Sequence, residues 1–212
     1  MANRFANIRK DYSKNTIDER KVEKNPFDQF LLWLNDAIEA GIEEPNAMAL
    51  ATVSEKGFPS ARMVLLKHAD RNGFVFFTNY NSRKGRHLET NPNAALLFHW
   101  EDMERQVRIE GRVEKTEVGE SDAYFNLRPT DSRINAIISP QSKKIPDRDT
   151  LEQLRADYIA SGAAIVRPEN WGGYRLKPVY FEFWQGRPNR LHDRISYCGS
   201  PEEGWKIRRL AP

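Results

Sequence analysis

The spacing of apolar residues changes along the chain, from a helical period near residue 30 to a strand period after residue 47. Asn25-Pro26 predicts a helix start, because asparagine caps helices and proline fits the first turn, and Gly41 predicts the helix end. Apolar residues between these points recur at helical spacing, which predicts a stripe that packs in the core. The stripe consists of Phe27, Phe30, Leu31, Leu34 and Ile38.

After this helix, short apolar runs separated by turn signals predict strands. The expected strands are 47–54, 60–68, 74–79, 94–100 and 105–117. Their connections are too short for parallel crossovers, so neighbouring strands are expected to be antiparallel. Such a meander favours a sheet curled into a barrel, interrupted by one short helix after Ser82.

The second half of the chain predicts helices at 119–127 and 150–159, with an irregular polar segment at 129–148 between them. Thr150 and Gln153 have the spacing of a capping box at the start of the second helix. Three final strands are expected, at 174–184, 190–198 and 205–210. The fold class is therefore mainly β, an antiparallel barrel with peripheral helices.

Length and composition narrow the class of protein. A chain of 212 residues fits one domain, so we expect a flexible arm at 1–25 and a single domain at 26–212. No apolar run approaches the roughly 20 residues of a membrane span. A single cysteine, Cys198, is typical of a cytoplasmic protein without disulfides. The net charge of +3 favours local anion sites over a nucleic-acid surface.

Cationic residues gather on a predicted hairpin near the C-terminus. Phe181-Glu182-Phe183-Trp184-Gln185 is followed, after a turn at 186–189, by Arg190-Leu191-His192-Asp193-Arg194. Side chains alternate along a strand, so Arg190, His192 and Arg194 are expected on one face. Such a face indicates an anionic or aromatic ligand. The alternative is a solvated face paired with acids such as Glu182.

Two further segments are candidate anion sites. Arg83 and Lys84 follow the expected cap Ser82, in a helical turn whose dipole disfavours cations unless an anion binds there. Tyr124 and Arg128 share a helix face at i, i+4 spacing, with Ser132 just beyond. For Arg83 and Lys84 the alternative is that both side chains simply extend into water. For the second segment it is an ordinary solvated helix end, in which Arg128 complements the C-terminal dipole of the helix.

Polar residues also occur within two of the predicted strands. Ideal alternation places Arg62 and Lys67 on opposite faces of one strand, where they could serve two ligands or two parts of one. Gln106 shares a face with Arg108, while Val107 and Ile109 are expected in the core. Gln106 could bind the edge of a heteroaromatic ring or form structural hydrogen bonds.

Several catalytic classes lack their motifs in this sequence. It contains no Walker loop, Rossmann fingerprint or Gly-x-Ser-x-Gly elbow, and the histidines His68, His87, His99 and His192 lack metal-ligand spacing. Several anion-binding elements and many aromatic residues remain, without an obvious nucleophile. This combination favours an enzyme in which a bound cofactor performs the chemistry.

Phe181 to Gln185, followed by four residues and then Arg190 to Arg194, resembles the signature of the pyridoxine/pyridoxamine 5′-phosphate oxidase family. Other blocks resemble that family in the same order along the chain. They are Arg62-Met63-Val64-Leu65-Leu66-Lys67, Phe77-Thr78-Asn79, Ser82-Arg83-Lys84, Glu104-Arg105-Gln106-Val107, Arg128-Pro129 with Ser132, Gln141-Ser142, Trp171-Gly172-Gly173, Trp205-Lys206-Ile207 and Arg209-Leu210-Ala211-Pro212.

The resemblance implies a split β-barrel homodimer that holds FMN at the subunit interface. It implies oxidation of pyridoxine or pyridoxamine 5′-phosphate to pyridoxal 5′-phosphate by O2, releasing H2O2, with NH3 from the amine. By position, the FMN site would comprise Arg62, Met63, Val64, Leu65, Leu66, Lys67, Phe77, Thr78, Arg83, Lys84, Gln106, Gln141, Ser142, Trp184 and Arg194.

The resemblance also implies a substrate site and two catalytic residues. Arg190 and His192 would lie over the pyridine ring opposite the flavin and orient its C4′ carbon. Arg9 and Tyr12 match an arm that can fold over the substrate. The implied substrate site comprises Arg9, Tyr12, Lys67, Tyr124, Arg128, Ser132, Arg190, Leu191 and His192.

The sequence departs from the family pattern after Ser132. Asn135 stands where glycine is common, Ile137 where tryptophan is common and Lys143 where serine is frequent. These changes concern local packing and dimer contacts and leave the implied ligand positions intact. Alternative functions are a related split-barrel flavin reductase, a non-catalytic carrier of flavin or pyridoxal phosphate, and a nucleic-acid-binding barrel.

Overall fold

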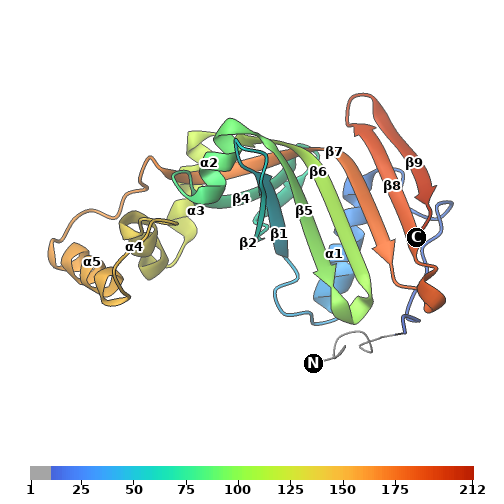
Figure 1. Cartoon of the computed structure of the whole chain (residues 1–212), viewed down its shortest axis with the longest axis horizontal. Helices are drawn as coiled ribbons and strands as arrows, with labels where there is room; N and C mark the ends of the chain where they lie inside the picture. The colour runs from blue at the N-terminus through green and yellow to red at the C-terminus, as the bar shows by residue number, and fades with distance from the viewer. Residues whose placement is uncertain (1–10) are drawn as a thin grey trace. The chain divides into compact units, whose positions relative to one another are not determined.

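The computed structural model describes residues 11–212, and its helices and strands are shown in Figure 1. Arg9, which the family resemblance places at the substrate, lies outside the described residues. The helices are α1 (Pro26–Glu39), α2 (Arg83–Thr90), α3 (Val118–Leu127), α4 (Thr130–Ile138) and α5 (Asp149–Ala160), with short 3-10 turns η1 (Glu101–Met103) and η2 (Pro188–Arg190). None of the described helices has the length and apolar character needed to cross a membrane.

The strands form one sheet, and every pairing register recorded for it is antiparallel. In spatial order the main path is β2-β1-β5-β6-β7-β4-β3, and β8 pairs with both β7 and β9. The predicted mainly-β antiparallel fold is confirmed. The strands are β1 (Ala47–Val53), β2 (Pro59–Leu65), β3 (His68–Asp70), β4 (Gly73–Asn79), β5 (Asn93–Trp100), β6 (Arg105–Lys115), β7 (Trp171–Gln185), β8 (Asp193–Ser200) and β9 (Gly204–Leu210).

The chain divides into two compact units. The terminal unit comprises Met1–Ala49, described from residue 11, with Ala95–Gly111 and Pro178–Pro212. The second unit, called here the pocket unit, comprises Leu50–Ala94 and Arg112–Lys177. The expected division into an arm at 1–25 and one domain at 26–212 stays a prediction.

Helix α1 begins as the sequence predicts, because the side chain of Asn25 accepts a hydrogen bond from the Phe27 backbone N–H. Within the terminal unit its buried face packs against aromatic residues of the sheet: Phe30 on Phe98, Trp33 on Phe183 and Phe27 on Phe181. The predicted stripe is only partly right. Leu31 and Ile38 are exposed, since Trp33 and Ala37 occupy the buried face in their place.

Two predictions are wrong, one for the segment before α5 and one for the start of α5. Residues 130–138 are helical as α4, with Ile134 buried, whereas the polar composition predicted an irregular segment. Helix α5 lacks the expected capping box. It begins at Asp149, and the Asp147 carboxylate accepts from both the backbone N–H and the hydroxyl of Thr150. Gln153 donates along the helix to Asp157 instead.

The predicted strand 60–68 is interrupted in the structure. β2 ends at Leu65 and β3 begins at His68. Lys67 lies between the two strands, where its backbone N–H donates to Val75 O of β4. Strand alternation therefore does not decide which way the Lys67 side chain points.

Candidate active site

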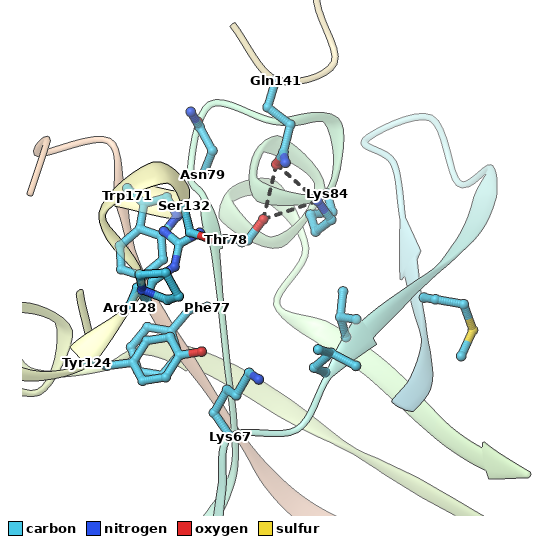
Figure 2. A pocket seen from close by; sticks show the side chains of 14 residues that line it. Lys67, Phe77, Thr78, Asn79, Lys84, Tyr124, Arg128, Ser132, Gln141 and Trp171 are labelled. Atoms are coloured by element: carbon cyan, nitrogen blue, oxygen red, sulfur yellow. Dashed lines mark hydrogen bonds between the residues drawn. The ribbon is translucent and has the colours of Figure 1, made fainter. Parts of the chain in front are cut away.

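The pocket unit contains a cavity of about 500 Å³ that gathers many of the predicted site residues (Figure 2). Its lining comes from β2, β4, β7, α2, α3 and α4, and from the connections that hold Lys67, Arg128 and Gln141. The lining residues are Met63, Val64, Leu65, Lys67, Phe77, Thr78, Asn79, Lys84, Tyr124, Arg128, Pro129, Ser132, Gln141 and Trp171.

One group of polar residues in the cavity comprises Lys67, Tyr124, Arg128 and Ser132. The Lys67 ammonium lies 6.0 Å from the centre of the Tyr124 ring. Nη1 of Arg128 is buried and has no hydrogen-bond partner among the described residues, and burial lowers the pKa of this guanidinium. A buried guanidinium N–H without a partner is costly, so this group is suited to binding an anionic oxygen.

Aromatic rings hold this group in place. Tyr124 stacks on Phe77 with ring centroids 4.0 Å apart, and Phe77 stacks in turn on Trp171. The Arg128 guanidinium lies 4.8 Å from the centre of the Trp171 ring, which favours a cation–π contact. Close packing beside Trp171 requires glycine, since a Cβ on Gly173 would lie 2.4 Å from the Thr116 hydroxyl oxygen.

A second polar group in the cavity comprises Lys84, Thr78 and Gln141 (Figure 2). Nζ of Lys84 donates to Thr78 Oγ1 at 3.1 Å and to Gln141 Oε1 at 3.2 Å. Burial, with the nearby Arg62, lowers the pKa of Lys84. Lys84 lies in the first turn of α2, which Ser82 caps by accepting from the Gly85 N–H as predicted. Figure 2 shows Gln141 and Lys84 in the upper part of the view, and Lys67 and Tyr124 in the lower part.

Arg62 lies in β2 of the same unit but does not line the cavity. Its Nη1 donates to Leu50 O and Thr52 Oγ1, and its Nη2 donates to Ser60 Oγ. Burial and the charge of Arg83 lower the pKa of Arg62. None of Arg62, Arg83 and Lys84 forms an ion pair within the described part of the chain, so these cations lack a neutralising acid.

In the terminal unit, the hairpin differs from the predicted one. Strand β8 begins at Asp193, and Arg190 ends the 3-10 turn η2 with φ of 60°. The prediction that Arg190, His192 and Arg194 share one strand face is therefore wrong. Positive φ at Asn189 and Arg190 widens the turn, and β7–β8 pairing extends only to Gln185 and Asp193.

His192 is nevertheless held in a defined orientation. Its Nδ1 accepts from the Arg187 backbone N–H at 3.1 Å, so a neutral imidazole here carries its proton on Nε2. Burial and the neighbouring Arg190 lower the pKa of His192, which favours this neutral form. The imidazole centroid lies 4.7 Å from the Trp184 ring. His192 is thus suited to donating a hydrogen bond from Nε2.

Arg194 has the acidic partner that the alternative interpretation of the hairpin expected. Its Nε donates to Glu182 Oε1 at 2.8 Å, and Arg108 donates to the other oxygen of Glu182 at 2.6 Å. Burial raises the pKa of Glu182, but the hydrogen bonds from these two guanidiniums bring it below its usual value. Arg194 Nη1 also donates to Ala211 O near the C-terminus.

The described part of the N-terminal arm contacts the same hairpin. The Tyr12 ring meets Trp184 and His192 edge-on, with ring centroids 5.7 and 5.6 Å apart. A Cβ on Gly186 would lie 2.7 Å from the Tyr12 ring. Hydrogen bonds hold the arm next to Tyr12. The buried Glu104 carboxylate accepts from the backbone N–H groups of Ser13 and Lys14.

Some of the expected site residues line the cavity and others do not. Leu66 is buried in the core, Arg83 and Ser142 are exposed outside the cavity lining, and Gln106 lies in β6 of the terminal unit. Asn79, Pro129 and Trp171 also line the cavity, although the sequence indicated no role for them in the site. A tryptophan followed by two glycines was the available signal for Trp171.

Two family models match parts of this chain. Residues 34–158 match the family model described as pyridoxamine 5′-phosphate oxidase. The chain belongs to the pyridoxamine 5′-phosphate oxidase family. Residues 171–212 match the model described as the pyridoxine 5′-phosphate oxidase C-terminal dimerisation region, so both models cover parts of the chain that carry the expected site residues.

Curated relatives in this family resemble the chain along nearly its whole length. Pyridoxine/pyridoxamine 5′-phosphate oxidase 1 of Ralstonia nicotianae is 55% identical over 209 residues, covering 98% of this chain and 99% of the relative. The pyridoxine/pyridoxamine 5′-phosphate oxidase of Burkholderia mallei is 56% identical over 211 residues, with the same coverage.

Solved structures show that the chain has the split-barrel fold of the family, as predicted. PhzG from Burkholderia lata, solved with tetrahydrophenazine-1-carboxylic acid, matches with a TM-score of 0.88 and 32% identity, over 96% of this chain and all of PhzG. A pyridoxamine 5′-phosphate oxidase-related, FMN-binding protein from Nostoc punctiforme matches with a TM-score of 0.71 and 17% identity, over 89% of this chain and 98% of that protein.

Proposed function

We propose that the chain oxidises pyridoxine 5′-phosphate and pyridoxamine 5′-phosphate to pyridoxal 5′-phosphate, using FMN and molecular oxygen. H2O2 is released with either substrate, and NH3 with the amine. The names of relatives that are 55–56% identical support this activity. The observation that carries the proposal is the presence in one cavity of two separate polar groups that contain cations, one for each of two phosphorylated ligands.

The residues present fit FMN. Lys84, Arg83 and Arg62 lack a neutralising acid in the described residues, and a phosphate would supply the missing negative charge. These residues would hold FMN, and the bound flavin would supply an acceptor for the hydride from C4′ of the substrate and a route for the electrons to oxygen. The other residues that would hold it are Met63, Val64, Leu65, Leu66, Lys67, Phe77, Thr78, Gln106, Gln141, Ser142, Trp184 and Arg194.

The substrate phosphate would bind to the group that contains Arg128. The buried Nη1 of Arg128 would donate to a phosphate oxygen, and the Tyr124 and Ser132 hydroxyls with Lys67 would supply further donors. Stacking of Tyr124 on Phe77 fixes the direction of the phenol. Anchoring the phosphate in this way would limit the positions that the reacting carbon can take.

Residues of the terminal unit would orient the pyridine ring. Arg190, Leu191 and His192 would contact the ring, with His192 donating from Nε2. The Tyr12 ring, which contacts Trp184 and His192, would exclude water from them. We further propose that the protein works as a homodimer with FMN at the subunit interface, and the match of residues 171–212 to a dimerisation region supports this.

A second candidate function is oxidation of a polycyclic aromatic acid. The 0.88 TM-score to PhzG, solved with tetrahydrophenazine-1-carboxylic acid, favours it, because a carboxylate could occupy the Arg128 group in place of a phosphate. The two functions differ in their requirement for phosphate. Pyridoxine without its phosphate should then be a much poorer substrate than pyridoxine 5′-phosphate for this chain.

Reconstitution with FMN tests the proposal. The protein should bind FMN, turn yellow and convert pyridoxine 5′-phosphate to pyridoxal 5′-phosphate, with kcat/KM at least about 100-fold higher than for pyridoxine, since the Arg128 group would form several charge-assisted hydrogen bonds. A colourless protein that cannot be reconstituted would contradict FMN binding. Conversion of dihydro- or tetrahydrophenazine carboxylic acids in preference to the B6 phosphates would favour the second function.

A further inference from the structure

A buried histidine lies behind the cationic residues that we propose for the cofactor phosphate. His87 belongs to α2, the helix that also carries Arg83 and Lys84, and its side chain is buried. The roles considered above, in binding and in orienting ligands, do not involve it. A buried imidazole needs a hydrogen-bond partner, and the partner of His87 connects it to a different element of the fold.

That partner is Thr52 of β1, which is itself 1% exposed. The Thr52 hydroxyl lies 3.1 Å from His87 Nδ1 and 2.8 Å from Nη1 of Arg62 in β2. The guanidinium can only donate, so Thr52 accepts from Arg62, and its own proton can be donated to the imidazole. The three side chains form a continuous chain of hydrogen bonds from α2 through β1 to β2.

We propose that His87 is a positioning residue for the cofactor phosphate, acting through the Thr52 hydroxyl on the Arg62 guanidinium. The inference rests on the proposed binding of FMN in the same unit. Leu50 O and Ser60 Oγ also accept from Arg62, but among the described residues only Thr52 connects the guanidinium to the helix that carries Arg83 and Lys84. The connection therefore fixes the position of Arg62 relative to Arg83 and Lys84.

The charges around His87 favour a neutral imidazole, which can accept the Thr52 proton. Burial lowers its pKa most, and the charges of Arg83 and Arg86 of α2 and of Arg62 of β2 lower the pKa further. The acidic residue of α2, Glu89, is exposed, and no acid contributes to the shift of His87. A neutral His87 adds no further positive charge near Arg62, Arg83 and Lys84.

FMN affinity measured by fluorescence quenching tests the inference with four variants. His87→Ala and Thr52→Val each remove the connection, the latter with little change of shape, and each should weaken FMN binding about fivefold to tenfold. The double variant should bind FMN no more weakly than either single variant, because both break the same chain. His87→Asn, whose amide can replace Nδ1, should recover most of the affinity.

His99→Ala, at an exposed histidine of β5, is the matched control and should leave FMN affinity unchanged. Thermal melts of the apo variants separate binding from folding, and Thr52→Val keeps the test available if His87→Ala does not fold. Wild-type FMN affinity in Thr52→Val, additive losses in the double variant, or no recovery in His87→Asn would each overturn the inference and leave the proposed function standing. Failure of the wild type to bind FMN would overturn both.

Discussion

The rings of Phe77 and Tyr124 stack with their centroids 4.0 Å apart and their planes inclined by 20°. This contact joins β4 to α3 and fixes the direction in which the Tyr124 hydroxyl points. The ring packs on Phe77, and the proposed role of the hydroxyl in binding substrate can therefore be tested separately.

Tyr124→Phe keeps the stacked ring and removes the hydroxyl. We expect its melting temperature to stay near that of the wild type, while KM for pyridoxine 5′-phosphate rises about threefold to tenfold through loss of one hydrogen bond. Tyr124→Ala should raise KM similarly and also lower the free energy of unfolding by about 1–3 kcal/mol through loss of the ring. An unchanged KM in Tyr124→Phe would remove this hydroxyl from the substrate site.

Arg128 should be sensitive even to replacement by lysine. Lysine keeps the charge but loses the planar fork that lies over Trp171. That fork carries the buried Nη1, which has no hydrogen-bond partner within residues 11–212. We expect Arg128→Lys to raise KM for the phosphorylated substrates about tenfold to 100-fold, with FMN affinity changed less than threefold. Steady-state kinetics and FMN titration measure the two effects. A larger loss of FMN affinity than of substrate affinity would assign Arg128 to the cofactor instead.

Glu182 should make the free energy of unfolding depend on pH. Its pKa is lowered in the fold, so the stabilisation is complete above the unfolded value of about 4.3 and is lost as pH falls through the folded value. Glu182→Gln should flatten the fall in melting temperature within this acidic window. At pH 7 the variant should be less stable by about 1–2 kcal/mol, because Arg108 and Arg194 lose a charged acceptor. Parallel melting curves of the two proteins below pH 4.3 would contradict the assignment.

Glu104 should control exposure of the N-terminal arm. Glu104→Ala removes the acceptor of the Ser13 and Lys14 backbone N–H groups, so hydrogen exchange around residues 12–17 should accelerate about tenfold. Exchange in α1 should not change, and Glu43→Gln, at an exposed glutamate, is the control. Unchanged exchange at Ser13 and Lys14 in Glu104→Ala would show that other contacts hold the arm.

The sequence predicted correctly those elements whose ends are set by helix caps and short turns. The Asn25 cap with Pro26 placed α1, the Ser82 cap placed α2, and short turns placed the antiparallel strands. The sequence around Ser82 and the Tyr124/Arg128 spacing also indicated residues that line one cavity, namely Lys84, Tyr124 and Arg128. In each case neighbours in sequence carry the information.

Features that depend on distant contacts or unusual backbone angles could not be predicted in this way. Asn189 and Arg190 have positive φ although neither is glycine, so Arg190 lies in a 3-10 turn and not in the predicted strand. Trp171 lines the cavity because it packs on residues distant in sequence, among them Phe77 and Tyr124. His87 gains its connection to Arg62 through Thr52, which is 35 residues earlier in the chain. Family resemblance supplied site residues but not these contacts.

Oxygen uptake by the FMN-loaded protein is the most direct test of the proposed oxidase activity. With pyridoxine 5′-phosphate or pyridoxamine 5′-phosphate, we predict that one O2 is consumed and one H2O2 formed for each pyridoxal 5′-phosphate, with one NH3 from the amine only. Arg190→Lys should reduce this turnover far more than it reduces FMN affinity. Full loading with FMN but no oxygen uptake with either substrate would contradict the proposed activity.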